Sequence, residues 1–469
     1  MSRLTALARS QSRQFHVFMQ MNLEKEIDEW LKSFKEKPYK HFDLIVKSND
    51  YMTGGKLRSD LSDPATLQTY KFWPFLRFDD KQRRFRKNLK NNLIIDEKLR
   101  PIMYASHRDS ALMSFYSFLL KKNYEAKIKG APLEKSVIAY RKIPSPLGGN
   151  KSNIDFANDI FRLLQTLDGY TVFCLDIKGY FDNINHRILK EKIKTFSSGI
   201  PKDGLDPILK AVTKYRYVYK RDAAKALGNK AWSNPKKYNR QIRDSGLIHH
   251  NLKGHGIPQG SPISDILSNI YLYDFDIEVC KLVSAFTYGF YFRYCDDIIL
   301  AVPKRDARKI YETICEKITE SKVDIKKEKT EAFCVDAKKN IFNDITSEFV
   351  EEYQKHREFL QYLGFDINLK AIKIRSGTIA GMYRRAARVY YGRHKNMAPR
   401  NCFGRYDYLN RSDRRLGGGL PIHQTRKIKK GMKKRFCKAA NDIQKNHFQQ
   451  LIKTEVVKTN HKNIDNQKP

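Results

Sequence analysis

The chain has 469 residues, of which 41% are hydrophobic and 30% are charged. This composition is typical of a folded globular protein with room for two or three domains, and it excludes a disordered tail. Lys and Arg number 90 against 51 Asp and Glu, so the net charge is +39, which indicates a polyanionic partner such as nucleic acid. No segment is typical of a transmembrane helix or a basic amphipathic anchor, so we expect no membrane partner.

The seven cysteines are scattered and include no Cys-x-x-Cys pair. This pattern predicts a reducing compartment, argues against structural zinc and favours a cytoplasmic location. The first 23 residues carry Arg and Ser without an acidic residue, which resembles a mitochondrial transit peptide only faintly. We interpret this segment as a basic N-terminal arm.

One amphipathic helix is predicted near the N-terminus from the spacing of Leu23, Ile27, Trp30, Leu31 and Phe34. Aromatic and basic residues alternate over residues 72–120, which fits either a solvated face or a surface that follows phosphates. A loop rich in Gly and Pro over residues 144–150 precedes an apolar helical stripe that ends at Leu164 and is interpreted as core packing. A buried strand, TVFCLDI, follows.

Two later intervals are strongly basic. Residues 197–254 include KYRYVYKR and PKKYNR, and the sequence assigns them no fold. Residues 371–469 carry 25 Lys and Arg against 5 Asp and Glu, so about half of the excess positive charge lies in the last fifth of the chain.

Carboxylates end two of the predicted strands. The buried strand in LDIKGYFDNINH ends at Asp176, and RYCDDIILAV places Asp296 and Asp297 at the tip of a hairpin. Because adjacent buried carboxylates repel each other, a cation is expected beside them. Three carboxylates at one point of a sheet suit magnesium, and two such ions support in-line phosphoryl transfer.

Three more motifs surround these carboxylates. GIPQGSPISDILSNIYLYDFD begins with a loop in which Gly256 and Gly260 would let the backbone approach a flat group such as a base pair. An ordinary turn at the start of a helix is the alternative interpretation. DIKKEKTEAF contains Lys329, and FLQYLGFDI contains Leu363 and Gly364.

In this order, the motifs resemble the palm of a reverse transcriptase, an RNA-directed DNA polymerase, over roughly residues 81–374. LDIKGYFDNI is similar to the motif of the first catalytic aspartate, GIPQGSPIS to the template and nucleotide loop, YCDD to the catalytic hairpin, EKT to the lysine motif and YLGF to the primer grip. The resemblance implies an α+β right-hand polymerase, with fingers, a palm made of an antiparallel sheet with helices on one face, and a basic helical thumb. It divides the chain into a helical, basic N-terminal extension (1–80), fingers and palm (81–370), and thumb and tail (371–469).

The resemblance also implies roles for residues near the carboxylates. Asp176 and Asp296 would be the principal ligands of two Mg²⁺ ions, with Asp297 as a weaker or more distant ligand and the carbonyl of Ile177 as a further one. Phe181 lies five positions after the first aspartate, where an aromatic residue blocks a ribose 2′-hydroxyl, so deoxynucleotides are the expected substrates. The alternative is that Phe181 is simply part of the core.

Further roles concern the nucleotide. Gln259 matches the loop glutamine beside the incoming nucleotide, and Lys329 matches the lysine that protonates the departing pyrophosphate. Arg141 and Lys142 would hold the triphosphate. A solvated Lys329, and a basic strand that merely carries Arg141 and Lys142, are the alternatives.

The remaining matches concern nucleic acid. They are Gly256 and Gly260 in the loop, Leu363 and Gly364 in the primer grip, and Arg384, Arg385 and Arg388 in a thumb helix that grips the template-primer duplex through its phosphates.

No ribonuclease H-like segment follows the predicted thumb, and no paired cysteines mark a zinc nuclease. The chain is therefore most similar to the bacterial reverse transcriptases associated with phage defence, including the abortive-infection group, with retron enzymes next. This subgroup implies a cognate noncoding RNA as template, deoxynucleotide substrates and a DNA product. Cys295 in the hairpin, where alanine is common, and the 80 residues between Asp176 and Gly256 leave the host system and template handling open.

Other functions stay open at this point. The same site would serve template-independent or protein-primed DNA synthesis, and a non-catalytic RNA-binding scaffold with a polymerase fold is the alternative from another class. The sequence does not decide between a monomer and a homo-oligomer, and it does not identify the RNA or the trigger of a defence response.

Overall fold

The computed structural model describes residues 22–35, 41, 55–87, 93–146, 148–228, 239–353 and 356–381. The predicted N-terminal arm, most of the predicted thumb and tail, and the residues Arg384, Arg385 and Arg388 lie outside this part of the chain.

A five-stranded antiparallel sheet forms the centre of the predicted palm, with strand order β6-β7-β3-β8-β9. The strands are β3 (Asp168–Asp176), β6 (Phe290–Tyr294), β7 (Asp297–Pro303), β8 (Glu331–Asp336) and β9 (Ile341–Asp344). Strand β3 lies in the middle, and it pairs with β7 on one side and β8 on the other. The strand predicted to end at Asp176 is therefore central.

Both faces of this sheet are buried, because alternate residues of each strand enter two different hydrophobic clusters. Phe173 and Leu175 pack against α14 (Tyr273–Ser284) and α15 (Ala307–Glu320). Val172 and Cys174 pack with α7 (Asn153–Leu164) and with a three-stranded sheet of β10 (Leu360–Tyr362), β11 (Phe365–Ile367) and β12 (Ile372–Ile374). The sequence predicted helices on one face only; here α7 and the small sheet cover the second face.

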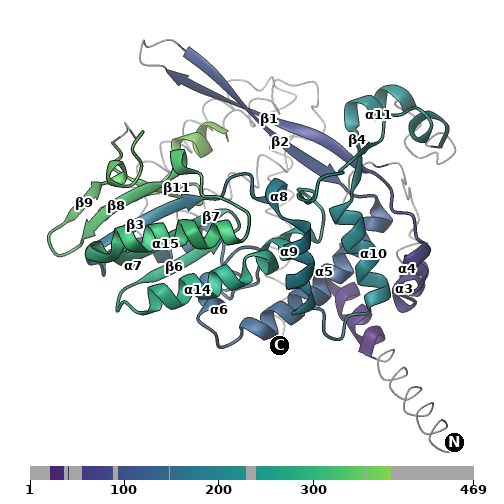
Figure 1. The fold of residues 1–469 in the computed structure, drawn as a ribbon, viewed down its shortest axis with the longest axis horizontal. Helices are drawn as coiled ribbons and strands as arrows, with labels where there is room; N and C mark the ends of the chain where they lie inside the picture. Colours follow the sequence, from purple (N-terminus) through teal and green to yellow (C-terminus); the bar gives the residue numbers. More distant parts are fainter. Residues whose placement is uncertain are drawn as a thin grey trace, which may run out of the picture.

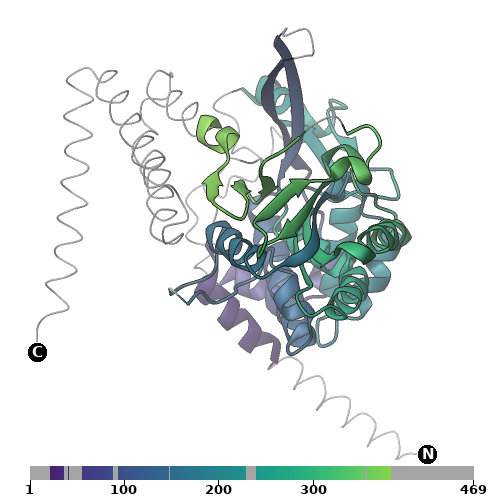
Figure 2. The ribbon, with the colours of Figure 1, turned by 90° about the vertical axis from the view of Figure 1, so that its left-hand side faces the viewer.

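A second sheet has the order β2-β1-β4-β5 and contains a long hairpin of β1 (Phe75–Lys87) and β2 (Leu93–Tyr104), which projects from the body of the molecule (Figures 1 and 2). The basic interval 197–254 completes this sheet. Strand β4 (Arg216–Tyr219) pairs in parallel with the start of β1, and β5 (His249–His250) pairs antiparallel with β4. The predicted domain boundary after residue 80 falls inside β1.

The interval also contributes helices α10 (Lys202–Thr213) and α11 (Lys220–Leu227) and a π-helical turn at Asn239–Arg243. Helix α10 contacts α4 (Thr66–Thr69) and the long, buried helix α5 (His107–Ile128). A helix over residues 22–33 also packs here, with Trp30 Nε1 donating a hydrogen bond to Ser114 Oγ at 3.3 Å. The predicted N-terminal amphipathic helix is thus confirmed as part of the main hydrophobic cluster.

The remaining elements are short and connect the two sheets. The helices are α3 (Lys56–Ser62), α6 (Leu133–Ser136), α8 (Tyr180–Asn183), α9 (His186–Lys194) and α13 (Ser264–Tyr271). Three turns of 3-10 helix lie at Lys304–Asp306, Lys327–Lys329 and Thr346–Glu348. Among the described residues, every helix is too short or too polar to cross a membrane.

Candidate active site

The register of the central sheet brings the predicted carboxylates together. Asp176 at the end of β3 lies directly opposite Asp297 at the start of β7. The amide of Ile177 donates a hydrogen bond to the carbonyl of Asp296 at 2.9 Å. Since residues opposite each other on antiparallel strands have side chains about 5 Å apart, the prediction that Asp176 faces the acidic hairpin is confirmed.

The acidic hairpin closes through a two-residue turn, because Tyr294 pairs with Asp297 and leaves only Cys295 and Asp296 between the strands. Cys295 has a φ of 60°, which is the left-handed region that such turns require and that residues other than glycine rarely adopt. The hydroxyl of Tyr140 donates a hydrogen bond to Cys295 Sγ at 3.3 Å. Backbone strain of this kind persists only where the surroundings hold it in place.

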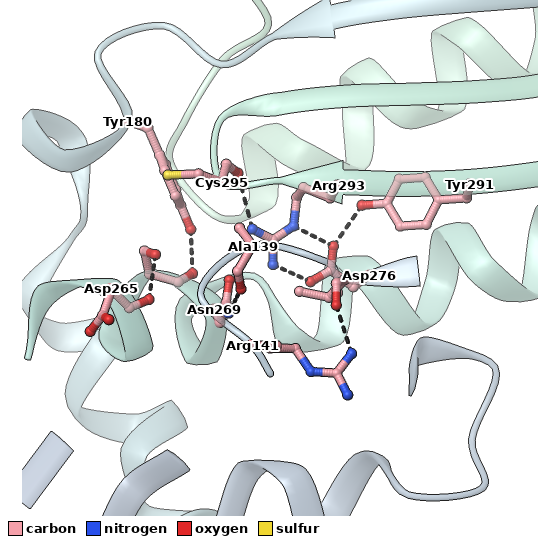
Figure 3. A network of polar contacts seen from close by, with 11 residues as sticks. Ala139, Arg141, Tyr180, Asp265, Asn269, Asp276, Tyr291, Arg293 and Cys295 are labelled. Atoms are coloured by element: carbon pink, nitrogen blue, oxygen red, sulfur yellow. Dashed lines mark hydrogen bonds and ion pairs between the residues drawn. The ribbon is translucent and has the colours of Figure 1, made fainter. Parts of the chain in front are cut away.

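A buried ion pair holds this turn from below (Figure 3). Arg293 on β6 and Asp276 on α14 are both 0% exposed, and Arg293 Nε donates to Asp276 Oδ1 at 2.7 Å. Arg293 Nη1 donates to the carbonyl of Cys295 at 3.0 Å, and Tyr291 Oη donates to Asp276 Oδ1 at 2.6 Å. The guanidinium therefore links helix α14 to the backbone of the catalytic turn.

Burial raises the pKa of Asp276, and the Arg293 guanidinium opposes that rise. A carboxylate and a guanidinium in two-point contact, with the Tyr291 hydroxyl as a third donor, satisfy the desolvated charges. Two elements that are distant in sequence are thereby fixed to each other without water.

Lys329 lies at the other side of the carboxylates. Its ammonium forms an ion pair with Asp176 Oδ2, and the neighbouring amide of Lys326 donates to the carbonyl of Asp176 at 2.7 Å. The lysine predicted as a proton donor is thus directly bonded to the first carboxylate instead of being a solvated residue.

Asp297 is the carboxylate whose protonation the site changes most clearly. Burial raises its pKa to about 7, the negative charges of Asp296 and Asp176 add to the rise, and the positive charges of Lys329 and Arg100 oppose it. Carboxylates under mutual repulsion fit a divalent cation, which would remove the repulsion.

Within the described ranges, no group of three or more His, Cys, Asp or Glu side chains is arranged to hold a metal ion by itself. This finding agrees with the way in which Mg²⁺ is usually bound, by one or two carboxylates together with phosphate oxygens of the substrate. The donor set at Asp176 and Asp297 therefore fits magnesium that arrives with a triphosphate better than a permanently filled protein cage.

The loop with the two glycines packs against protein backbone. Gly256 has a φ of 90°, and a Cβ there would lie 3.1 Å from the carbonyl oxygen of Asp182. Gly260 has a φ of 101°, and a Cβ there would lie 2.9 Å from the carbonyl oxygen of Met103 on β2. The glycines are needed for these close contacts, so the reason that the sequence suggested, an approach to a base pair, is replaced by a packing reason.

Gln259 lies between the same two neighbours. Its carbonyl accepts a hydrogen bond from the amide of Met103 at 2.8 Å. Its side chain bonds to Asp182, whose pKa is raised by burial and lowered by the positive charges of Arg77 and Lys253. The loop is thus connected to both the second sheet and helix α8.

Phe181 and Lys142 come together at one cavity of about 630 Å³, which Tyr140, Gly260 and Ser261 also line. The structure therefore places the residue predicted to exclude a 2′-hydroxyl, one predicted triphosphate ligand and the loop around the same space. Phe181 is half-buried, so it is neither a core residue nor fully solvated.

Arg141 is not part of this cavity. Its side chain is 6% exposed and forms an ion pair with Glu125 at 2.7 Å. Two of its hydrogen bonds go to the carbonyls of Glu134 and Val137. With its donors used inside the protein, Arg141 fixes the segment before Lys142 and is not available to a triphosphate, contrary to the prediction.

Leu363 and Gly364 form the turn between β10 and β11, with φ angles of 47° and 90°. The carbonyl of Gly364 accepts a hydrogen bond from the amide of Arg375 at 3.0 Å. Strand β10 contacts β3, so this turn belongs to the layer behind the catalytic strand.

Three residues of this region were not predicted as functional. Arg293 lay in the quoted hairpin motif and Asp276 in the quoted loop and helix, but their pairing needs the fold to be known. Arg100 on β2 acts on Asp297 through its charge. The only sequence signal for Arg100 was the basic and aromatic alternation over residues 72–120.

Comparisons with known proteins give one family and several distant structures. Residues 90–367 match the family described as reverse transcriptase (RNA-dependent DNA polymerase). Telomerase from Candida tropicalis, truncated from its C-terminal domain, is similar at 14% identity with a TM-score of 0.38, over 70% of this chain and 59% of that chain. Telomerase from Candida albicans in complex with a TWJ fragment of telomeric RNA is similar at 13% identity with a TM-score of 0.37, over 70% and 50%.

The chain thus spans between half and three-fifths of the length of these telomerase chains. The sequence comparison with curated proteins gave no match.

Proposed function

The chain belongs to the reverse transcriptase family, and from this premise we propose that it copies a cognate noncoding RNA into DNA in a bacterial defence system against phages. The observation that carries the catalytic part of this proposal is the cross-strand pair of Asp176 and Asp297, with Asp296 in the adjacent turn and Lys329 bonded to Asp176.

Reverse transcriptases use divalent metal ions. In this chain Asp176, Asp296, Asp297 and the carbonyl of Ile177 would hold two Mg²⁺ ions, which supply activation of the primer 3′-hydroxyl and charge neutralisation of the triphosphate.

The chain's own residues would perform the remaining tasks. Lys329 keeps a proton close to the phosphates and donates it to the departing pyrophosphate. Phe181 excludes a ribose 2′-hydroxyl at the cavity that Lys142 also lines, and Lys142 binds the triphosphate. Gln259 is held by Asp182 and Met103 where it would contact the nucleotide.

A row of aromatic residues on β4 supports binding of the unpaired template. Tyr215 and Tyr217 alternate with Arg216 along the chain, so their side chains share the opposite face of the strand from Arg216. Arg77 lies over the ring of Tyr217 at 5.2 Å, and His249 stacks on Tyr217 at 5.1 Å. Because Arg77 also acts on Asp182 beside Gln259, this face is oriented toward the loop. Aromatic faces of this type stack on single-stranded bases.

Nucleic-acid contacts at the loop (Gly256, Gly260), at the predicted primer grip (Leu363, Gly364) and along the predicted thumb (Arg384, Arg385, Arg388) complete the proposal, as do the three-part domain division and a cytoplasmic location. The defence role is supported by the motif series and by the net charge of +39, which suits an RNA partner.

The first experiment measures magnesium-dependent incorporation of labelled deoxynucleotides by the full chain, purified with the nucleic acid that it carries. The matched protein has Asp296→Ala and Asp297→Ala, and both the product and the bound RNA are sequenced. We expect a product that is complementary to the bound RNA and absent from the variant. A product without a template would favour untemplated or protein-primed synthesis, and equal behaviour of both proteins would favour the scaffold. Plaque counts in cells that carry either protein test the defence role separately.

A further inference from the structure

We propose that a basic groove beside helix α10, outside the catalytic cleft, binds a single-stranded segment of the RNA partner. The groove has a volume of about 1080 Å³ and lies between α4, residues 70–73, helix α10 and the start of β4. None of the residues that line it belongs to the site around Asp176. Figure 1 shows α4 and α10 beside each other, on the side of the molecule away from β8 and β9.

The first argument is charge without partners. Two carboxylates, Asp203 and Asp206, line the groove, against six cationic side chains: Lys71, Lys202, Lys210, Lys214, Arg216 and Arg243. In the part of the chain that the structure describes, none of these six forms an ion pair. Several lysines elsewhere do so: Lys121 with Asp265, Lys122 with Glu26 and Lys317 with Glu278. An excess of unpaired cations around one hollow favours an anionic occupant.

The second argument is the presence of fixed aromatic side chains in the same groove. Tyr70, Phe72 and Trp73 line it and are half-buried. Tyr70 Oη donates to Asp109 Oδ1 at 2.7 Å, and the amide of Trp73 donates to Asp109 Oδ2 at 2.9 Å. Arg216 donates to the carbonyl of Phe72. Aromatic faces on a fixed backbone, combined with exposed lysines, are the usual means of binding unpaired bases and their phosphates.

Size and shape select among anions. Sites for single small molecules enclose roughly 300–1,000 Å³, so this groove suits a longer occupant. Lys210 and Lys214 are one helical turn apart, about 6 Å along the axis of α10, which suits successive contacts along a strand. A duplex hides its bases from stacking, whereas a single strand exposes them, so we infer a single strand.

This inference rests on the proposed function only in requiring an RNA partner. Strand β4 separates the groove from the tyrosine row, because Arg216 and Tyr217 project from opposite faces. The groove therefore holds a part of the RNA that is not being copied, while the tyrosine row faces the part that is.

The test uses three full-length proteins. The groove variant combines Lys202→Gln, Lys210→Gln and Lys214→Gln, all exposed positions on α10 or at its end. The control variant combines Lys281→Gln, Lys304→Gln and Lys309→Gln, which are exposed on α14, at the turn after β7 and on α15. Both variants lose three positive charges, so any difference between them depends on position.

The probe is a fluorescein-labelled single-stranded RNA of mixed sequence, titrated at several salt concentrations. We expect the groove variant to bind about tenfold more weakly than the control at low salt, with a salt slope smaller by about 2, since each lost phosphate contact removes about 0.7. Extension of a short, pre-annealed template and primer should be equal in all three proteins, because it needs only the cleft.

Equal RNA binding by the two variants would overturn the proposal. So would an unchanged affinity for RNA together with a reduced affinity for a labelled polyglutamate peptide, which would identify a protein partner instead. If the wild-type chain extends no primer but the groove variant still loses RNA binding, the proposed function fails and the groove stands.

Discussion

Around the catalytic turn, Arg293 is paired with Asp276 and Lys329 with Asp176, whereas the six cations of the basic groove have no carboxylate partner among the described residues. The first region is dry and its charges are satisfied inside the protein. The second is open, and its charges face solvent.

The contrast follows from the task of each region. A carboxylate that takes part in phosphoryl transfer must be held within a fraction of an ångström, so its supports have to be paired and buried. A surface that follows a flexible polyanion needs charge but no fixed geometry, because each phosphate contact is worth little by itself and releases counterions. Four changes break or sharpen this comparison.

The largest effect should follow from breaking the buried pair. Asp276→Leu leaves the Arg293 guanidinium buried without its partner, so we expect the free energy of unfolding to fall by about 3–5 kcal/mol. Deoxynucleotide incorporation should fall with it, because the carbonyl of Cys295 loses its fixed donor. Urea denaturation and primer extension measure the two effects.

The control for that change removes both charges. The double variant Asp276→Leu, Arg293→Met should recover most of the lost stability, since no unpaired charge remains. If its incorporation recovers as well, Arg293 does not position the turn. Stability within about 1 kcal/mol of wild type for the single variant would contradict the buried pair itself.

A pH effect should follow from Glu331 on β8, which contacts Arg357 and accepts a hydrogen bond from the amide of Gln361 at 3.0 Å. Burial raises the pKa of Glu331 from 4.5 to about 7, although Arg357 opposes the rise. The folded state therefore binds this proton more tightly than the unfolded state. The stability from this group is complete below pH 4.5 and is lost as the pH rises through 7.

Glu331→Gln removes that loss. We expect the stability of the variant relative to wild type to increase between pH 5 and pH 8, by about 2–3 kcal/mol in total. Chemical denaturation at several pH values measures the difference. A relative stability that decreases toward alkaline pH would mean that the ion pair with Arg357 outweighs the desolvation of the carboxyl group.

A smaller effect should follow from Gly260→Ala. The left-handed φ and the Met103 carbonyl oxygen, 2.9 Å from the new Cβ, force the loop away from β2 at a cost of about 2 kcal/mol. Incorporation should decrease while RNA binding in the groove stays unchanged. Gly254→Ala is the matched control, because nothing lies within 4 Å of its Cβ; equal thermal midpoints for both variants would contradict the close approach.

The smallest effect should come from the groove. Asp203 accepts a hydrogen bond from Gln68 Nε2 at 2.7 Å, and asparagine keeps that acceptor while it removes the negative charge. Asp203→Asn should therefore strengthen binding of single-stranded RNA by about twofold at low salt. Glu351→Gln, at an exposed position outside the groove, should change nothing. Weaker binding by Asp203→Asn would argue against a phosphate beside this carboxylate.

The sequence predicted those parts of the site that depend on local structure. A buried strand that ends at Asp176 and a tight hairpin with Asp296 are both written in short stretches of chain, and the family resemblance placed them opposite each other. Arg141 could not be predicted correctly, because the Glu125 carboxylate that binds its guanidinium comes from a separate helix. The same limit applies to Arg293 and Asp276, whose pairing depends on how α14 packs on the sheet.

The fold of residues 197–254 escaped prediction for a related reason. Strand β4 has four residues and β5 has two, so neither shows a period that distinguishes it from a loop. Their pairing with β1 is set by contacts that are far apart in sequence. The six cations of the groove likewise come from segments that only the fold brings together.

The parallel pairing of β4 with the start of β1 has a consequence for anyone who wishes to shorten this enzyme. A polymerase engineer who excised residues 197–254 as a dispensable loop would uncover Phe75, Leu76 and Arg77 as an open strand edge. Such edges pair readily with other chains, so the trimmed protein should be lost to aggregation during expression. Miniaturised versions would have to begin from the opposite end of that sheet, at the projecting tip of β1 and β2.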